Sequence, residues 1–226
     1  MYRNFFKRII DFFCALLAIV CLSPVLVVLT ILGAIKMKGN PFFTQLRPGK
    51  NEKIFKLIKF RTMTCETDAN GKLLPDEVRL TSYGKFLRST SLDELPELFN
   101  ILKGDMAVIG PRPQLVRDMV FMTPEQRRRH TVRQGLSGLA QVNGRNAVTW
   151  ETKIAYDLQY IEHITLWGDV KIIFTTFAKV FKRSDITEEN CDTATDLGDY
   201  LLATGKISQT EYDLGQEQAK KLMEAV

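Results

Sequence analysis

The stretch Phe12–Ile35, FFCALLAIVCLSPVLVVLTILGAI, decides the fold, because its 24 residues include no charged side chain. A straight helix of that length would be about 36 Å long, enough to cross a hydrocarbon core of about 30 Å. Ser23-Pro24 lies in its middle, and Pro24 has no N–H to donate to the Val20 carbonyl. Ser-Pro is also a common helix start, with Ser as the N-cap. We therefore expect two half-helices, about 16 Å and about 18 Å long, each reaching about halfway into a bilayer.

Basic residues flank both ends of this stretch. Because Lys and Arg favour the cytoplasmic side, a re-entrant hairpin keeps both clusters inside, whereas a spanning helix leaves one outside. The broken backbone must be satisfied at membrane depth, and we expect Ser23 to cap it. A spanning anchor with a proline kink stays an open alternative, while the run is too long for a cleaved signal peptide. The flanking residues are Arg3, Lys7 and Arg8 before the stretch and Lys36, Lys38, Arg47 and Lys50 after it.

The charge of the chain changes along its length. Residues 1–184 carry a net charge of +12, and residues 185–226 a net charge of −7. A basic body beside an apolar insertion suits an anionic membrane surface and phosphorylated substrates. No nucleic-acid recognition motif is present, so we expect no nucleic-acid partner. We divide the chain into a membrane element at 1–38, one cytoplasmic domain at 39–184 and an acidic extension at 185–226.

The cysteines and histidines suggest no chemistry. The cysteines form no C-x-x-C pair, which predicts neither a zinc site nor a disulfide framework and fits a reducing cytosol. His130 and His163 are isolated, and we assign neither a role. The four cysteines are Cys14, Cys21, Cys65 and Cys191.

Periodicity predicts one β-hairpin among helices. Two aromatic and aliphatic runs, Phe42–Leu46 and Ile54–Phe60, are separated by turn residues and predict a hairpin. The polar segment 64–75 predicts a surface loop. Helical spacing follows at 77–102 and again at 149–182, where Gly168 marks the expected break. The acidic extension predicts one or two short helices in a partly ordered appendage.

An acidic pair, Asp93-Glu94, lies where a helical pattern restarts. Pro96 favours a helix start just before it, while Ser91 and Glu94 match a capping box, and the two starts remain alternatives. Acidic residues at a helix start complement the macrodipole and need no other role. The same position favours an ionised carboxylate, which would prepare Asp93 as a nucleophile. Adjacent carboxylates beside Arg88 could also hold a divalent cation.

Two arginines lie in segments suited to phosphate binding. Pro111 and Pro113 fix the backbone on either side of Arg112, whose planar guanidinium can pair two phosphate oxygens. A structural arginine in a Pro-rich turn explains the same pattern equally well. Arg145 ends a glycine-rich run that could approach a ligand closely.

Other charged residues predict surface positions. EQRRR at 125–129 predicts a solvated helix face or a membrane-surface patch. Asp157 and Asp169 are expected at the surface or at helix caps.

Several of these stretches together resemble those of a known family. LDELPELFNILKGDM at 92–106, VIGPRP at 108–113 and GLSGLAQVNGR at 135–145, with KFRTM at 59–63 and the Ser-Pro upstream, are similar to motifs of the bacterial sugar transferases. More narrowly, the chain resembles the small monotopic polyprenyl-phosphate phosphoglycosyl transferases over about residues 1–184. The acidic extension has no counterpart in this resemblance.

The resemblance implies a fold and a location. We expect an α+β, mostly α protein with an N-terminal re-entrant helix-break-helix, a short β-hairpin, and surface and interfacial helices around one catalytic domain. It would lie at the cytoplasmic face of the bacterial inner membrane. Its partners would be a UDP-sugar, polyprenyl phosphate, the cytoplasmic leaflet and downstream glycosyltransferases.

The resemblance also implies a reaction, the transfer of a sugar-1-phosphate from a UDP-sugar to polyprenyl phosphate with release of UMP. Asp93 matches the nucleophile that forms a phosphosugar-aspartyl intermediate, and Glu94 its partner carboxylate, with Mg²⁺ as the expected cation. Arg88, Arg112 and Arg145 match phosphate-binding positions, and Ser23-Pro24 matches the break in the membrane helix. A non-catalytic membrane-anchored scaffold of a glycan assembly complex stays the alternative. No residue pattern indicates which sugar is used.

Overall fold

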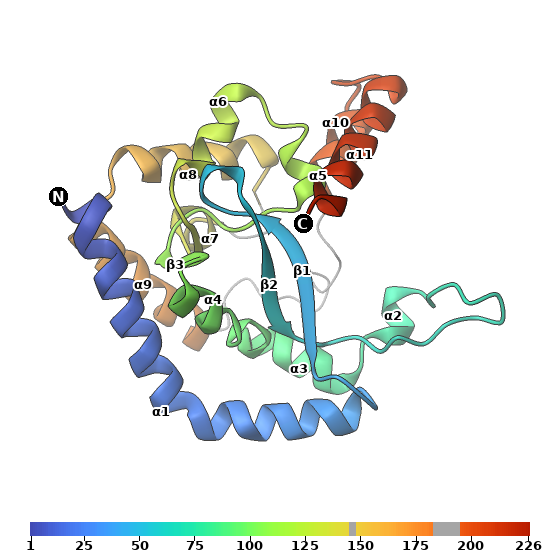
Figure 1. Cartoon of the computed structure of the whole chain (residues 1–226), viewed down its shortest axis with the longest axis horizontal. Helices are drawn as coiled ribbons and strands as arrows, with labels where there is room; N and C mark the ends of the chain where they lie inside the picture. Colours follow the sequence, from blue (N-terminus) through green and yellow to red (C-terminus); the bar gives the residue numbers. More distant parts are fainter. Residues whose placement is uncertain (145–147, 183–194) are drawn as a thin grey trace.

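The computed structural model describes residues 1–144, 148–182 and 195–226, so the expected boundary between residues 184 and 185 lies outside the described residues (Figure 1). Helices dominate the described residues, as predicted, beside two small β-sheets. In chain order the elements are η1 (Tyr2–Phe6), α1 (Lys7–Lys36), β1 (Phe42–Pro48), η2 (Lys50–Glu52), β2 (Ile54–Phe60), α2 (Asp76–Arg79), α3 (Ser82–Thr90), η3 (Leu92–Glu94), α4 (Glu97–Lys103), β3 (Met106–Ile109), α5 (Val116–Met119), α6 (Pro124–Arg127), η4 (Arg128–Thr131), β4 (Gln134–Ser137), α7 (Leu139–Val142), α8 (Trp150–Glu162), α9 (Leu166–Lys182), α10 (Leu197–Ala203) and α11 (Gln209–Glu224).

The apolar stretch forms a single helix, α1, that continues through Ser23-Pro24. The expected division into two helices with Ser23 as an N-cap is therefore wrong. The Ser23 hydroxyl instead donates to the Val20 carbonyl at 2.8 Å, and so satisfies the acceptor that Pro24 leaves without a backbone donor. The helix bends rather than ends, and in Figure 1 its second half turns to run beneath α3.

One side of α1 packs on the body and the other is exposed. Ala15 joins the core cluster that contains Ile101 of α4, while Leu26 and Leu29 join the cluster that contains Leu87 of α3. Among the described residues, α1 is the one helix long and apolar enough to cross a membrane. Only 17% of its most apolar 18-residue window is buried. The large exposed side chains along it include Phe13, Leu17, Val20, Val27, Val28, Ile31 and Ile35.

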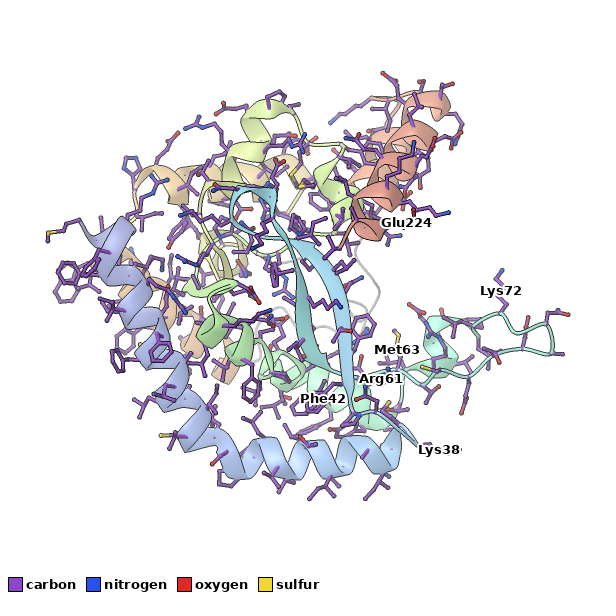
Figure 2. The ribbon with its side chains drawn as sticks, viewed as in Figure 1. Lys38, Phe42, Arg61, Met63, Lys72 and Glu224 are labelled. Carbon is purple, nitrogen blue, oxygen red and sulfur yellow. The ribbon has the colours of Figure 1, made fainter. Side chains whose placement is uncertain are left out.

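The predicted β-hairpin is confirmed. β1 and β2 pair antiparallel, with Phe42 opposite Phe60 and Pro48 opposite Ile54. The Phe42 and Phe60 rings stack with centroids 5.4 Å apart, which fixes the open end of the hairpin. The predicted surface loop after β2 projects away from the body, with Lys72 near its tip (Figure 2).

The helical boundaries differ from the expected ones at two places. Ser91 adopts the left-handed conformation (φ 55°) and ends α3 without forming the capping box, and α4 begins at Glu97, directly after Pro96. The break between α8 and α9 falls at residues 163–165, and Gly168 lies inside α9. The break at Gly168 was therefore a wrong prediction.

A short parallel pair, β3 with β4, leads into the segment that carries Arg112. Met106 lies opposite Gln134, and Ile109 opposite Ser137. Beyond β3 the Gly110 amide donates to the Ser137 carbonyl at 2.9 Å, and the Gly135 amide donates to the Pro111 carbonyl at 2.8 Å. A Cβ on Gly135 would lie 2.1 Å from the Gly110 nitrogen, so this close approach of two backbones requires glycine.

The described part of the acidic extension, residues 195–226, is helical and packs on the body, so this part is not the loose appendage that we expected. Ala219 of α11 packs with Val116 and Met119 of α5, and the rings of Phe121 and Tyr212 stack 5.8 Å apart. The two described helices of the extension, α10 and α11, lie together beside α5 in Figure 1.

Candidate active site

The acidic pair lies in a short 3-10 turn between two helices. Because Ser91 in the left-handed conformation reverses the chain after α3, Asp93 and Glu94 fall in η3, ahead of α4. Pro96 then leads into the first turn of α4. Both carboxylates are half-buried, so solvent or a substrate can still reach them.

Glu94 is held by two cations from distant parts of the chain. Lys59 of β2 donates to Glu94 Oε1 at 2.9 Å, and the Arg112 guanidinium donates to the same oxygen. The Glu94 and Lys59 side chains are each 18% exposed, so little water screens their charges. Burial raises the pKa of Glu94, but Arg112 and Lys59 overcome it and hold that pKa well below its ordinary value. Glu94 is therefore a fixed anion at neutral pH.

Asp93 has a different environment. Within the described residues it makes no hydrogen bond or salt bridge, so neither of its oxygens is engaged. Burial and the neighbouring Glu94 charge raise the pKa of Asp93 to about 6, against the opposing effects of Lys59, Arg112 and Arg88. Asp93 is therefore mostly ionised at neutral pH, yet close to the point where it takes up a proton.

Lys59 and Glu97 are site residues that the sequence reasoning missed. Lys59 also pairs with Glu97 of α4 at 3.2 Å, and the Glu97 side chain is only 3% exposed. Burial raises the pKa of Glu97 to about 7, helped by the charge of Glu94. The sequence did contain one indication of this contact, the spacing of three polar residues. Side chains three residues apart share a helical face, and Glu94, Glu97 and Asn100 have this spacing, which could have predicted a polar face directed toward β2.

Asn100 fixes the distance between α4 and β2. Its side-chain oxygen accepts from the Ile58 amide at 3.1 Å, and its side-chain nitrogen donates to the Lys56 carbonyl at 2.8 Å. Asn100 is 1% exposed and so takes the place of a neighbouring strand along this edge of β2. This contact sets the register that lets Lys59 reach Glu94.

Two arginines, the buried Arg129 and the half-buried Arg47, hold the segment that carries Arg112. Arg129 donates to the Arg112 carbonyl at 2.7 Å, and Arg47 donates to the Pro113 carbonyl at 3.2 Å. Arg129 is 0% exposed and pairs with Asp157 at 2.7 Å. The expected solvated face at 125–129 is therefore wrong for Arg129, although Glu125 and Arg128 are exposed. Asp157, expected at the surface or at a helix cap, is instead buried inside α8. With its backbone fixed, the Arg112 side chain is 41% exposed and can meet both Glu94 and a ligand.

Arg88 approaches the acidic pair from α3. Its Nε donates to Thr62 Oγ1 at 3.2 Å, and its charge lowers the pKa of Asp93. α3 can lie this close because Gly84 meets the Thr62 backbone, where an added Cβ would be 1.9 Å from the carbonyl oxygen. The structure thus brings Arg88 and Arg112 to Asp93-Glu94. Arg145 lies outside the described residues.

The carboxylates fit a cation only if a ligand completes the site. Mg²⁺ in proteins is often bound by one or two carboxylates together with substrate phosphates. Asp93 has unengaged oxygens, whereas Glu94 Oε1 is already bound by Lys59 and Arg112. Among the described residues, no group of three His, Cys, Asp or Glu side chains gathers to hold a metal. The donor set therefore suits Mg²⁺ shared with a phosphate group rather than a site built from protein ligands alone.

Comparison with known proteins places this chain in a family. The sequence profile of a family described as bacterial sugar transferase matches residues 2–183. An uncharacterized sugar transferase of Bacillus subtilis, EpsL, is 45% identical over 190 residues, covering 83% of this chain and 93% of the relative.

Two longer relatives have more specific names. The UDP-glucose:undecaprenyl-phosphate glucose-1-phosphate transferase of Klebsiella pneumoniae is 41% identical over 186 residues, 78% of this chain and 40% of that protein. The undecaprenyl-phosphate galactose phosphotransferase of Salmonella typhimurium is 35% identical over 200 residues, 80% of this chain and 41% of that protein. The match therefore spans less than half of each of these two relatives.

Proposed function

Because this chain belongs to the bacterial sugar transferase family, we propose that it transfers a sugar-1-phosphate from a UDP-sugar to a polyprenyl phosphate. The reaction runs through a covalent phosphosugar-aspartyl intermediate on Asp93 and releases UMP. The names of the Klebsiella and Salmonella relatives support this class of substrates.

One observation carries the proposal, the contrast between two adjacent carboxylates. Glu94 Oε1 accepts from both Lys59 and Arg112, and these two cations reduce the nucleophilicity of the Glu94 carboxylate. Asp93 has no hydrogen-bond or ion-pair partner among the described residues, is partly exposed, and has a pKa near 6. An unengaged carboxylate beside several cations is suited to attack phosphorus.

In the first step, an Asp93 oxygen attacks the sugar-linked phosphorus of the UDP-sugar. The bond from that phosphorus to the bridging oxygen breaks, and the oxygen leaves with UMP, which needs no general acid. In the second step, an oxygen of polyprenyl phosphate attacks the same phosphorus and displaces the Asp93 carboxylate. The product is polyprenyl-diphosphate-sugar, and Asp93 is regenerated.

Arg112, Arg88 and Lys59 supply the positive charge that this chemistry needs. Two anionic substrates and an anionic nucleophile must meet, and stabilising their combined charge is the main catalytic requirement in phosphoryl transfer. Mg²⁺, held by Asp93 and Glu94 together with the donor's phosphates, would neutralise further negative charge on the diphosphate.

We also propose that α1 is re-entrant and enters only the cytoplasmic leaflet of the bacterial inner membrane. Both halves of α1 are attached to the same body, since Arg8 donates to the Ile101 and Leu102 carbonyls and Tyr83 donates to the Leu29 carbonyl. In Figure 1 the body lies on the concave side of the bend, which leaves the convex, apolar side for lipid. A straight span would pull one half away from its contacts.

The first experiment measures UMP release from a panel of UDP-sugars by the full chain in detergent, with Mg²⁺ and undecaprenyl phosphate. Asp93→Asn should abolish release, and Asp213→Asn, an exposed position on α11, should leave it unchanged. Without acceptor, intact-mass spectrometry should show the wild-type chain gaining one sugar-phosphate. A folded protein that releases no UMP from any donor would overturn the proposal and favour the scaffold alternative.

Membrane placement is tested by cysteine labelling in a background without native cysteines. Arg3→Cys and Lys38→Cys lie beyond the two ends of α1, and Lys38 is visible at its far end in Figure 2. A re-entrant helix predicts that a membrane-impermeant maleimide labels both positions from the cytoplasmic side. Labelling from opposite sides would show a spanning helix.

A further inference from the structure

A cavity of about 350 Å³ lies at the N-terminal end of α1 and shares no lining residue with the Asp93-Glu94 cluster. Its walls come from five segments that are far apart in the sequence: η1 with the start of α1, the hairpin turn, β3, the residues before β4, and α8 with Ile164 just beyond it. The lining side chains that the argument uses are Arg3, Lys7, Arg8, Asp11, Lys50 and Arg133.

The cavity carries an excess of positive charge. Five of its lining side chains are cationic and one, Asp11, is anionic. Lys7 is neutralised by the nearby Asp169, to which it donates at 2.6 Å, and also lies 3.7 Å from Asp11. Within the described residues, Lys50 Nζ has no hydrogen-bond or ion-pair partner. The five lining cations therefore outnumber the nearby carboxylates, which are Asp11, Asp169 and Asp105, the last acting on Arg8.

Two of the arginines are fixed in place by the end of α4. Arg8 donates to the Ile101 and Leu102 carbonyls at 2.6 and 2.7 Å, and Arg133 Nε donates to the Gly104 carbonyl at 2.9 Å. A guanidinium has five N–H donors, so both side chains keep donors for a further acceptor. Rigidly mounted guanidinium groups in a polar cavity are suited to a phosphate group.

The surroundings of the cavity indicate where such a phosphate would come from. η1 and the first turns of α1 expose apolar side chains to the outside, at Phe5, Phe6, Phe12 and Phe13. A ligand with a phosphate head and apolar chains could place its head in the cavity and its chains along this surface. A free phosphate ion would occupy the cavity but would make no use of the apolar surface.

We propose that this cavity binds the phosphate of an anionic glycerophospholipid, with its acyl chains lying along the exposed face of α1. The bound lipid would hold the N-terminal half of α1 at the membrane interface. Because α4 connects this end of the body to Asp93-Glu94, the depth of the catalytic cluster relative to the headgroups would be set at the same time. The proposal requires membrane association but not the catalytic assignment.

The test is native mass spectrometry of the full chain in a non-ionic detergent, titrated with dioctanoyl phosphatidylglycerol. The variant Arg3→Gln/Lys50→Gln removes two exposed charges that line the cavity. The matched control Lys53→Gln/Lys56→Gln removes two exposed charges from the same hairpin outside it. We expect one bound lipid per wild-type chain, binding weakened about tenfold or more in the first variant, and unchanged binding in the control. Thermal unfolding without lipid confirms that both variants are folded.

Three results would overturn the proposal. The first is equal weakening in both variants, since this would mean a nonspecific charge effect. The second is equally tight binding of dioctanoylglycerol, which has the same chains and no phosphate. The third is binding of inorganic phosphate without any binding of phosphatidylglycerol, which would assign the cavity to a free anion.

Discussion

Single-turnover UMP release should depend on pH through Asp93. Burial and the charge of Glu94 raise the pKa of this carboxyl to about 6, and only the ionised form can attack phosphorus. With that pKa, Asp93 is about 90% ionised at pH 7 and about 10% at pH 5. The rate of UMP release should therefore approach its maximum above pH 6 and fall about tenfold from pH 7 to pH 5. With an unperturbed pKa of about 3.9, the rate would change by less than about 10% over the same range.

The assay must isolate the first half-reaction. Polyprenyl phosphate is a phosphomonoester whose second ionisation lies near pH 6, so its presence would add a second titration in the same range. UMP release is therefore measured by rapid quench without the acceptor, with enzyme in excess over the UDP-sugar. The diphosphate of the donor has no ionisation between pH 5 and pH 8, which leaves the protein as the source of any change.

Glu97 provides the decisive control, because it is the other carboxyl of the cluster with a raised pKa, about 7. Glu97→Gln keeps the size of the side chain and should retain the fall in rate near pH 6. Lys59→Met should move the fall to higher pH, since the Lys59 charge lowers the pKa of Asp93. A rate that is constant from pH 5 to pH 8, or a fall that disappears in Glu97→Gln, would refute the assignment to Asp93.

Lys59→Met and two further substitutions test the supports of the cluster. Lys59→Met should slow UMP release about 100-fold, because a cation bound to Glu94 is lost. In the same assay, the control Lys56→Met, on the exposed face of the same strand, should have little effect. Asn100→Ala should lower the free energy of unfolding by about 2–4 kcal/mol, because it leaves a buried Ile58 amide and Lys56 carbonyl unpaired. In the same denaturant titration, the control Asn143→Ala, at an exposed position, should lower it by less than about 1 kcal/mol. Asp157→Asn should cost about 3–5 kcal/mol, because Arg129 is then a buried charge without its carboxylate, and wild-type stability in chemical denaturation would contradict the ion pair.

Features determined by neighbouring residues could be predicted from the sequence. The β-hairpin was predictable because two runs with strand composition are joined by Arg47–Asn51, and the turn chemistry is contiguous with both strands. The surface loop after β2 was predictable for the same reason. Ser23-Pro24 was expected to separate two helices, but both residues lie inside the single helix α1. Whether the Ser23 hydroxyl caps a new helix or donates backward to Val20 depends on backbone geometry that the residue types do not determine.

Contacts between side chains that are far apart in the sequence could not be predicted. Lys59 and Glu94 are 35 residues apart, and Arg112 and Glu94 are 18 apart. A run such as EQRRR has the composition of a solvated surface, and only the position of Asp157, 28 residues beyond Arg129, buries one of its arginines. Asp169 was expected at the surface or at a helix cap. It lies in the first turn of α9 but is only 4% exposed, and it accepts from Tyr2 and Lys7, more than 160 residues before it.

The acidic extension was misjudged because small residues form its interface. Gly215 and Ala219 are the buried positions of α11, and an added Cβ on Gly215 would lie 2.4 Å from the Phe121 ring. A helix that packs through glycine and alanine buries its backbone against a neighbour without the large apolar residues that periodicity detects. The family match ends at residue 183, yet Asp118 of α5 accepts from the Leu197 amide of α10 at 2.9 Å.

The contact of the extension with α5 also affects the active site. α5 follows the Pro111–Pro113 segment after two residues, so the helices that pack on α5 also restrain the chain that carries Arg112. The same segment is held from the opposite direction by Arg129, through the Arg112 carbonyl. Among the described cations of the cluster, Arg112 lies on a loop, whereas Lys59 lies on a strand and Arg88 on a helix. The contact of Arg112 with Glu94 therefore depends on both supports. An extension outside the matched family region thus stabilises the geometry of a residue inside it.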